Sequence, residues 1–155
     1  MQTLNFPACN FRIRESEQRL EIFDIIRKRF VVLTPEEWVR QHLIHFMHFE
    51  KNVPLYMMAV ERGIRVNSLL RRFDLLVFAT GGKPVMIAEC KAPAVALSEE
   101  TLFQASAYNM ALKVEYLLIT NGLDHYCAKV SYEKNSLDFL SGIPDYQSLS
   151  GGPVK

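Results

Sequence analysis

Three charged residues interrupt two apolar stretches of this 155-residue sequence. Asp74 lies in the run Arg-Phe-Asp-Leu-Leu-Val-Phe, and Glu89 and Lys91 close the run Val-Met-Ile-Ala-Glu-Cys-Lys. An unpaired charge in an apolar strand is very costly, so such charges are usually paired, metal-bound or placed at the edge of an active site. Two carboxylates and an ammonium held on rigid strands can bind a divalent cation and position a water molecule.

The elements that must position these residues form a predicted β-hairpin. Gly81-Gly82 separates the two apolar runs and is a signal for a hairpin turn. Because side chains alternate along a strand, Glu89 and Lys91 point to the same face, and the hairpin brings Asp74 beside them. The earlier residues of that face are apolar, so we expect the charged site at the edge of a sheet, open to substrate.

A structural ion pair is the alternative explanation for these three residues. Glu89 could pair with Lys91, or Asp74 with a nearby arginine, as opposite charges often do on solvent-facing sheets. The apolar residues that flank the charges favour an active site over a solvated ion pair.

At these positions the chain resembles the PD-(D/E)xK nuclease superfamily, whose pattern is an acidic residue on one strand and Glu-x-Lys on the next. Over roughly residues 20–125 it resembles the N-terminal nuclease domain of type I restriction enzyme R (motor) subunits. The wider likeness is carried by Leu33-Thr34-Pro35-Glu36-Glu37-Trp38-Val39-Arg40-Gln41, Val60-Glu61, Arg72-Phe73-Asp74, Glu89-Cys90-Lys91-Ala92-Pro93, Gln104, Tyr108 and Asn121-Gly122.

The resemblance implies a restriction-endonuclease-like α/β fold, with a central mixed sheet of about four to five strands flanked by helices. It also implies Mg²⁺-dependent hydrolysis of DNA phosphodiester bonds, with Mn²⁺ as a substitute cation. Asp74 and Glu89 would bind the metal ion together with the backbone carbonyl of Cys90. Lys91 would orient or help deprotonate the attacking water and offset phosphate charge.

Two further acidic residues are accessory candidates, each with an ordinary alternative. Glu37 matches the acidic residue that the superfamily often carries on its first core helix, but a capping box with Thr34 would also explain it. Glu61 is either an extra acidic residue of the site or a charge on a surface turn.

Three residues are candidates for contacts with nucleic acid. Gln104 and Tyr108 match a Gln-x-x-x-Tyr element found in a subset of the superfamily. They would contact the nucleic-acid backbone or brace the site, or they would simply pack a helix on the sheet. Arg72 lies two positions before Asp74 and is the best placed of four neighbouring arginines to bind phosphate.

Composition indicates one soluble globular domain. The hydrophobic fraction is 49%, the charged fraction 23% and the net charge +1, so any nucleic-acid binding would need a local basic patch. Three cysteines without paired spacing favour a reducing cytoplasm, and no apolar run is long enough to span a membrane. We expect an N-terminal arm over 1–18, a nuclease-like domain over 19–147 and a flexible tail over 148–155.

Hydrophobic patterning predicts the order helix, three strands, helix, two strands. Thr34 and Pro35 begin the first helix, which is expected to run to about Phe49. The other predicted elements are strands over 20–24, 55–60, 69–79, 85–91, 114–120 and 126–132, and a second helix over 98–113.

The expected partner is DNA. A motor subunit would continue into a helicase, whereas this sequence ends at Lys155 without an ATP-binding motif. We therefore expect a nuclease that acts alone, as a homo-oligomer, or with a separate helicase or specificity subunit. The main alternative is a catalytically silent module of the same fold that binds nucleic acid or protein. A regulatory protein with no nucleic-acid partner is a third interpretation.

Overall fold

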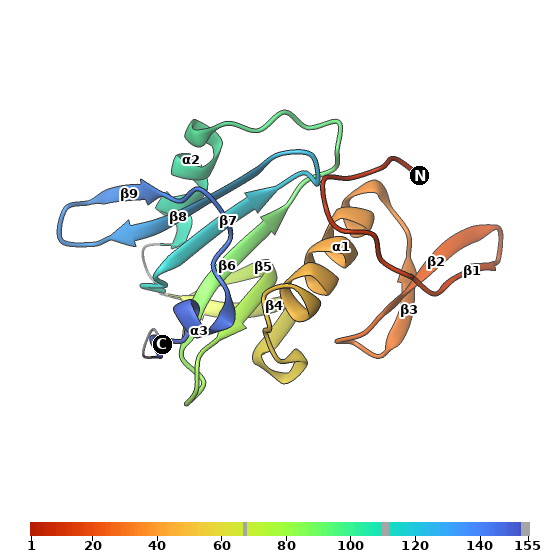
Figure 1. Ribbon diagram of the computed structural model, residues 1–155, viewed down its shortest axis with the longest axis horizontal. Helices are drawn as coiled ribbons and strands as arrows, with labels where there is room; N and C mark the ends of the chain where they lie inside the picture. The colour runs from red at the N-terminus through yellow and green to blue at the C-terminus, as the bar shows by residue number, and fades with distance from the viewer. Residues whose placement is uncertain (67, 110–111, 153–155) are drawn as a thin grey trace.

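The computed structural model describes residues 1–66, 68–109 and 112–152, and for residues 66 and 107–109 it describes the backbone alone. The described chain forms two sheets flanked by helices (Figure 1). The strands are β1 (Ile13–Ser16), β2 (Arg19–Asp24), β3 (Arg29–Val32), β4 (Met58–Val66), β5 (Leu69–Phe78), β6 (Pro84–Cys90), β7 (Tyr116–Thr120), β8 (His125–Ser131) and β9 (Ser136–Phe139). The helices are α1 (Pro35–Phe49), the 3₁₀ turn η1 (Leu55–Met57), α2 (Glu99–Asn109) and α3 (Tyr146–Leu149).

The larger sheet is mixed and has the strand order β4-β5-β6-β7-β8-β9. Strands β6 and β7 run parallel, and each of the other neighbouring pairs is antiparallel. A parallel pair needs a crossover connection, and α2 supplies it. The mixed α/β fold is therefore confirmed, with six strands instead of the expected four to five. The short strand β9 was missed because its four residues are largely exposed and form no apolar run.

The hairpin predicted around Gly81-Gly82 is present. Strand β5 pairs antiparallel with β6, and the two glycines between them have φ angles of +89° and +80°. That left-handed conformation is open to glycine without steric cost, which explains why the turn lies at these positions.

The helices α1 and α2 cover opposite faces of the larger sheet (Figure 1). Helix α1 begins as predicted, because the Thr34 side chain accepts the backbone N–H of Glu37 at 3.0 Å and Pro35 occupies the first turn. Its apolar residues, including Leu43 and Met47, pack against the sheet in the larger of two hydrophobic clusters. Leu102 of α2 belongs to the second cluster, on the other face.

The N-terminal segment is held more firmly than its polar, aperiodic sequence predicts. Leu4 is buried against Gly122, where a Cβ atom would lie only 2.8 Å from a Leu4 methyl carbon. The backbone N–H of Asn5 also donates to the Gly122 carbonyl at 2.7 Å. Strand β1, which lies inside the predicted arm over 1–18, joins β2 and β3 in a small antiparallel sheet. One buried leucine and one short edge strand produce no periodic pattern of apolar residues, so the sequence did not predict this packing.

Two other segments differ from their predicted structure. The sequence predicted a strand over 55–60, but Leu55–Met57 form the turn η1, and β4 continues through Glu61, which has a φ of 49°, to Val66. Near the C-terminus, Asp145 caps the short helix α3, whose Leu149 is buried although it falls in the predicted tail over 148–155. Residues 153–155 of that tail lie outside the described part of the chain. Within the described residues, the helices are too short or too polar to cross a membrane.

Candidate active site

Three carboxylates occupy neighbouring strands at one level of the larger sheet. The register of β4 on β5 places Glu61 opposite Asp74, since the positions on either side are matched pairs. The last matched pair of β5 and β6 before the site is Leu75 with Ala88, so Asp74 and Glu89 are the next positions along their strands. The hairpin therefore brings Asp74 and Glu89 onto adjacent antiparallel strands, as the sequence predicted.

Asp74 lies where β5 and β6 stop pairing, and both of its carboxylate oxygens are engaged. The Oδ2 atom accepts the backbone N–H of Cys90 at 2.8 Å, and Oδ1 accepts Nη2 of Arg40 at 2.7 Å. Within a strand, the N–H and C=O of one residue point to the same side, so the Cys90 carbonyl also faces β5. The backbone oxygen expected as a third metal ligand thus points toward the strand that carries Asp74.

Glu89 is unusual because its acid form is favoured at neutral pH. The pKa of its carboxyl is raised to about 8, first by burial and then by the charge of Asp74 and a hydrogen bond to Asp74, while Lys91 opposes the rise. Two adjacent carboxyls in a partly buried site resist carrying two negative charges at once. A cation bound between them would reverse this effect by favouring the ionised form.

The pKa of Glu89 predicts that the metal-free protein loses stability as pH rises. The unfolded-state pKa of a glutamate is about 4.3, so between pH 4.3 and about 8 the folded protein binds more protons than the unfolded chain. The free energy of unfolding should therefore fall across this window, by on the order of 3–5 kcal/mol at most. Urea unfolding in EDTA at pH 5, 6.5 and 8 measures the slope. Glu89→Gln should flatten it, and an equal slope in that variant would contradict the assignment.

Glu89 and Lys91 open onto a cavity of about 710 Å³ on the side of the sheet covered by α2. Lys91 directly follows β6, and its backbone N–H donates to the Thr120 carbonyl of β7 at 2.8 Å. Strand β6 is therefore hydrogen-bonded to β7 as far as Lys91, and on its other side the Cys90 amide is bonded to the Asp74 side chain of β5. The cavity is lined by Arg71, Arg72, Phe73, Glu89, Lys91, Thr101, Phe103, Gln104, Ala105 and Ile119.

The accessory candidates Gln104 and Arg72 both line this cavity. Gln104 Nε2 donates to Glu100 Oε1, one turn earlier on the same helix, at 3.4 Å. This contact holds the Gln104 amide at the wall of the cavity. Arg72 donates to Glu61 at 2.9 Å, and its side chain is 68% exposed. The side chain of Tyr108 lies outside the described residues.

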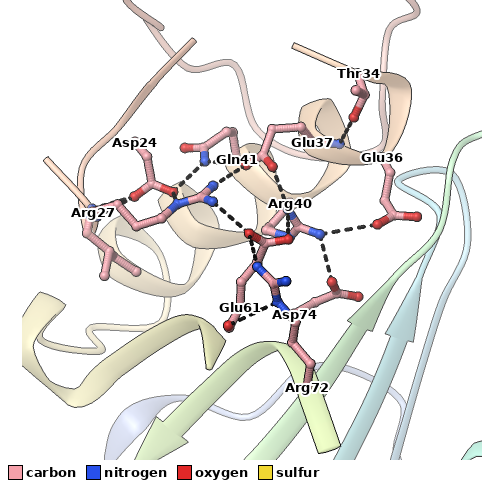
Figure 2. A network of polar contacts seen from close by, with 11 residues as sticks. Asp24, Arg27, Thr34, Glu36, Glu37, Arg40, Gln41, Glu61, Arg72 and Asp74 are labelled. Atoms are coloured by element: carbon pink, nitrogen blue, oxygen red, sulfur yellow. Dashed lines mark hydrogen bonds and ion pairs between the residues drawn. The ribbon is translucent and has the colours of Figure 1, made fainter. Parts of the chain in front are cut away.

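Glu37 and Glu61 occupy positions that differ from the ordinary explanations offered for them. The Glu37 carboxylate does not complete the capping box, because it turns inward and accepts from Arg27 at 2.7 Å and from Gln41 at 2.8 Å (Figure 2). Glu61 lies within β4 and accepts from Arg27 at 3.1 Å. Both residues belong to a buried polar network beside Asp74, so neither is a simple cap or a surface turn charge.

This network is connected by Arg27, Arg40 and Gln41, and the sequence did not predict that connection for any of the three. Arg40 and Gln41 follow Glu37 by three and four positions, so all three lie on one face of α1. They are buried, although charged residues are almost never fully buried unless paired. The sequence signal that could have identified these residues is a stripe of polar side chains at helical spacing, beside the apolar stripe of α1.

The residues at Asp74 fit a divalent cation that takes few protein ligands. In the part of the chain that the structure describes, no group of three His, Cys, Asp or Glu side chains is arranged around a common metal position. Mg²⁺ is usually held by one or two carboxylates and keeps several waters, and Asp74, Glu89 and the Cys90 carbonyl are the groups that could hold it here. The surrounding ion pairs join three guanidiniums, from Arg27, Arg40 and Arg72, to five carboxylates, from Asp24, Glu36, Glu37, Glu61 and Asp74. This excess of negative charge favours a cation.

Comparisons with known proteins identify the family of the chain and a solved structure of similar fold. Residues 35–144 match the family described as type I restriction enzyme R protein N terminus, which is more than half of the chain. A solved structure of a fragment assigned as the HsdR subunit of a type I restriction enzyme from Vibrio vulnificus has a similar fold, with a TM-score of 0.53 at 20% sequence identity. The similarity covers 76% of this chain but only 24% of that one. No curated protein matches the chain.

Proposed function

Since the chain belongs to the type I restriction enzyme R protein N-terminus family, we propose that it is a Mg²⁺-dependent endonuclease domain that hydrolyses DNA phosphodiester bonds. The observation that carries the proposal is the pairing of β5 with β6, which brings Asp74 beside Glu89. Lys91 opens onto the same cavity as Glu89. A structural ion pair alone would not require a raised glutamate pKa beside a second carboxylate.

Each residue of the site has a distinct role in this proposal. Asp74, Glu89 and the Cys90 carbonyl would hold Mg²⁺, or Mn²⁺ in its place. The bound cation would supply charge neutralisation at the phosphate. Lys91 would orient the attacking water and stabilise the negative charge that develops at phosphorus. Arg72, exposed at the cavity wall, would bind a neighbouring phosphate through its guanidinium.

The partners follow from the family and from the open cavity. DNA is the proposed substrate, and a separate helicase or specificity subunit is the proposed protein partner, because R subunits are components of type I restriction enzymes. With a formal net charge of +1, attraction to DNA would come from the local group of arginines near the cavity.

One observation favours the alternative, a module that binds nucleic acid without cutting it. Arg40 and the Cys90 amide already engage both oxygens of Asp74, so the carboxylate is satisfied without a cation. In that case the network would be a stabilising element of the fold. The two functions differ in whether DNA is cut when a metal ion is supplied.

Incubation of the purified protein with supercoiled plasmid tests the proposal. We expect nicked or linear products with Mg²⁺ or Mn²⁺ and none in EDTA. Gel-shift binding measured on the same preparation separates the two functions. Binding without cleavage under either metal would establish the non-cleaving module, whereas absence of both binding and cleavage would point to a missing partner subunit.

A further inference from the structure

Arg40 lies at the centre of the buried network beside Asp74 (Figure 2). Its side chain is only 5% exposed, and its guanidinium contacts Asp74 at 2.7 Å, Glu36 at 3.2 Å and Glu61 at 3.5 Å, as well as Glu37. Burial lowers the pKa of Arg40, but the charges of Asp74 and Glu37 outweigh burial and raise it overall. The group is therefore a permanent buried cation.

The contacts of Arg40 exclude a role in binding substrate. Its Nη atoms face four carboxylates and its exposed surface is minimal, so a DNA phosphate cannot reach it. Its Nε atom is buried without a hydrogen-bond partner in the described part of the chain. A buried N–H of this kind usually has a hydrogen-bond partner. Because Nε donates to none of the described groups, the carboxylates that contact the two Nη atoms set the orientation of the guanidinium.

Asp74 is the carboxylate whose position depends most directly on Arg40. Its Oδ1 is held by Arg40, and its Oδ2 is held by the Cys90 amide. Arg40 is held in turn through Glu37, which also accepts from Arg27 and Gln41. These bonds restrict the carboxylate to one orientation at the end of the β5–β6 pairing.

The support continues into residues that precede the family-matched region, which begins at residue 35. Arg27 donates to Asp24 at 2.7 Å as well as to Glu37 at 2.7 Å. Asp24 is fully buried at the end of β2 and also accepts from Gln41 at 2.8 Å. The small N-terminal sheet thus connects to Asp74 through two arginines and one carboxylate.

We infer that Arg40 is a positioning residue that holds the Asp74 carboxylate in the orientation needed to bind a cation, and that Asp24 and Arg27 complete this support. The cation-binding half of the inference rests on the proposed function. The orientation of Asp74 itself requires no metal, so it can be measured independently.

The Cys90 amide reports the position of Asp74, because it donates to Oδ2 at 2.8 Å. In metal-free Arg40→Gln, we expect hydrogen exchange of this amide to accelerate at least about tenfold and its NMR signal to shift. The matched control is Arg72→Gln, which removes one positive charge from the same network without contacting Asp74. That variant should leave the Cys90 amide unchanged. An unchanged amide in Arg40→Gln would refute the positioning role.

Titration with Mn²⁺ in the absence of DNA provides the second readout. Loss of a residue that orients a metal ligand typically lowers metal affinity about 10–100-fold, which is the fall expected for Arg40→Gln. Arg72→Gln should leave affinity equal or higher, since it only removes a repelling charge. If Mn²⁺ affinity rises in both variants, Arg40 acts as an opposing charge and does not position Asp74.

Arg40→Lys keeps the test decisive if Arg40→Gln does not fold. Lysine retains the charge, but a single ammonium cannot reproduce the planar fork that spans several carboxylates. The Cys90 amide should again exchange faster and Mn²⁺ should bind more weakly, and wild-type values for both would refute the inference. If wild type binds no Mn²⁺ and cuts no DNA, the proposed function fails, while the Cys90 amide still decides whether Arg40 positions Asp74.

Discussion

Replacing Lys91 with methionine is expected to slow DNA cleavage at least about 100-fold while DNA binding persists. This is the scale on which removing a positioned electrostatic or acid–base group lowers turnover. Lys91 lies at the cavity beside Glu89, and its proposed action is on the attacking water and the developing charge. An interaction made mainly in the transition state affects kcat more than binding. Methionine keeps the aliphatic stem, so packing is retained.

Single-turnover cleavage and gel-shift binding, measured across a range of salt concentrations, check this result. Binding should weaken as salt rises in both proteins, since phosphate contacts dominate the affinity. Lys83→Met is the matched control, because Lys83 is an exposed lysine near the β5–β6 turn, 3.6 Å from Glu115. Equal cleavage rates in wild type and Lys91→Met would remove Lys91 from the chemistry.

Mg²⁺ or Mn²⁺ should stabilise the wild-type protein, and Asp74→Asn or Glu89→Gln should abolish that response. A ligand that binds only the folded state stabilises it by about 2.7 kcal/mol at 100 times its Kd. Binding also requires the Glu89 carboxyl to ionise, so the response should weaken as pH falls below its pKa of about 8. Differential scanning calorimetry with and without metal, at pH 7 and 8.5, measures the shift in Tm.

The two variants should differ in the absence of metal. Asp74→Asn removes a charged partner of the buried Arg40 and should lower the metal-free Tm. Glu89→Gln removes a carboxyl whose ionised form is disfavoured and should raise the metal-free Tm at pH 8.5. Asp138→Asn, on the exposed part of β9, is the control and should retain the full metal response. A wild-type metal response in all three variants would exclude the assigned site.

The β5–β6 hairpin could be predicted from the sequence because every signal for it is local. Two glycines between apolar runs encode the turn, and alternation along β6 places Glu89 and Lys91 on one face. The start of α1 is equally local, since Thr34 and Pro35 satisfy the first turn of their own helix. Such features depend on residues only a few positions apart.

The polar network around Asp74 could not be predicted, because it joins residues far apart in the chain. Arg40 reaches Asp74 across 34 positions, and Arg27 reaches Glu61 across the same separation. The capping motif explained Glu37 by its neighbours alone, yet its carboxylate turns toward Arg27. The sequence around a charged side chain does not show which residue it will pair with. Its role depends on which distant charge the tertiary packing brings into contact with it.

In the small N-terminal sheet, too, local sequence predicted a strand, but only the tertiary structure showed its contact with the site. Leu20 to Asp24 was predicted as a strand from its composition, and β2 is present there. Its link to the site arises because Asp24 is buried beside Arg27 and Gln41 once α1 packs over it. Strand propensity is a property of a short segment, whereas the stability of a buried charge depends on every element that surrounds it.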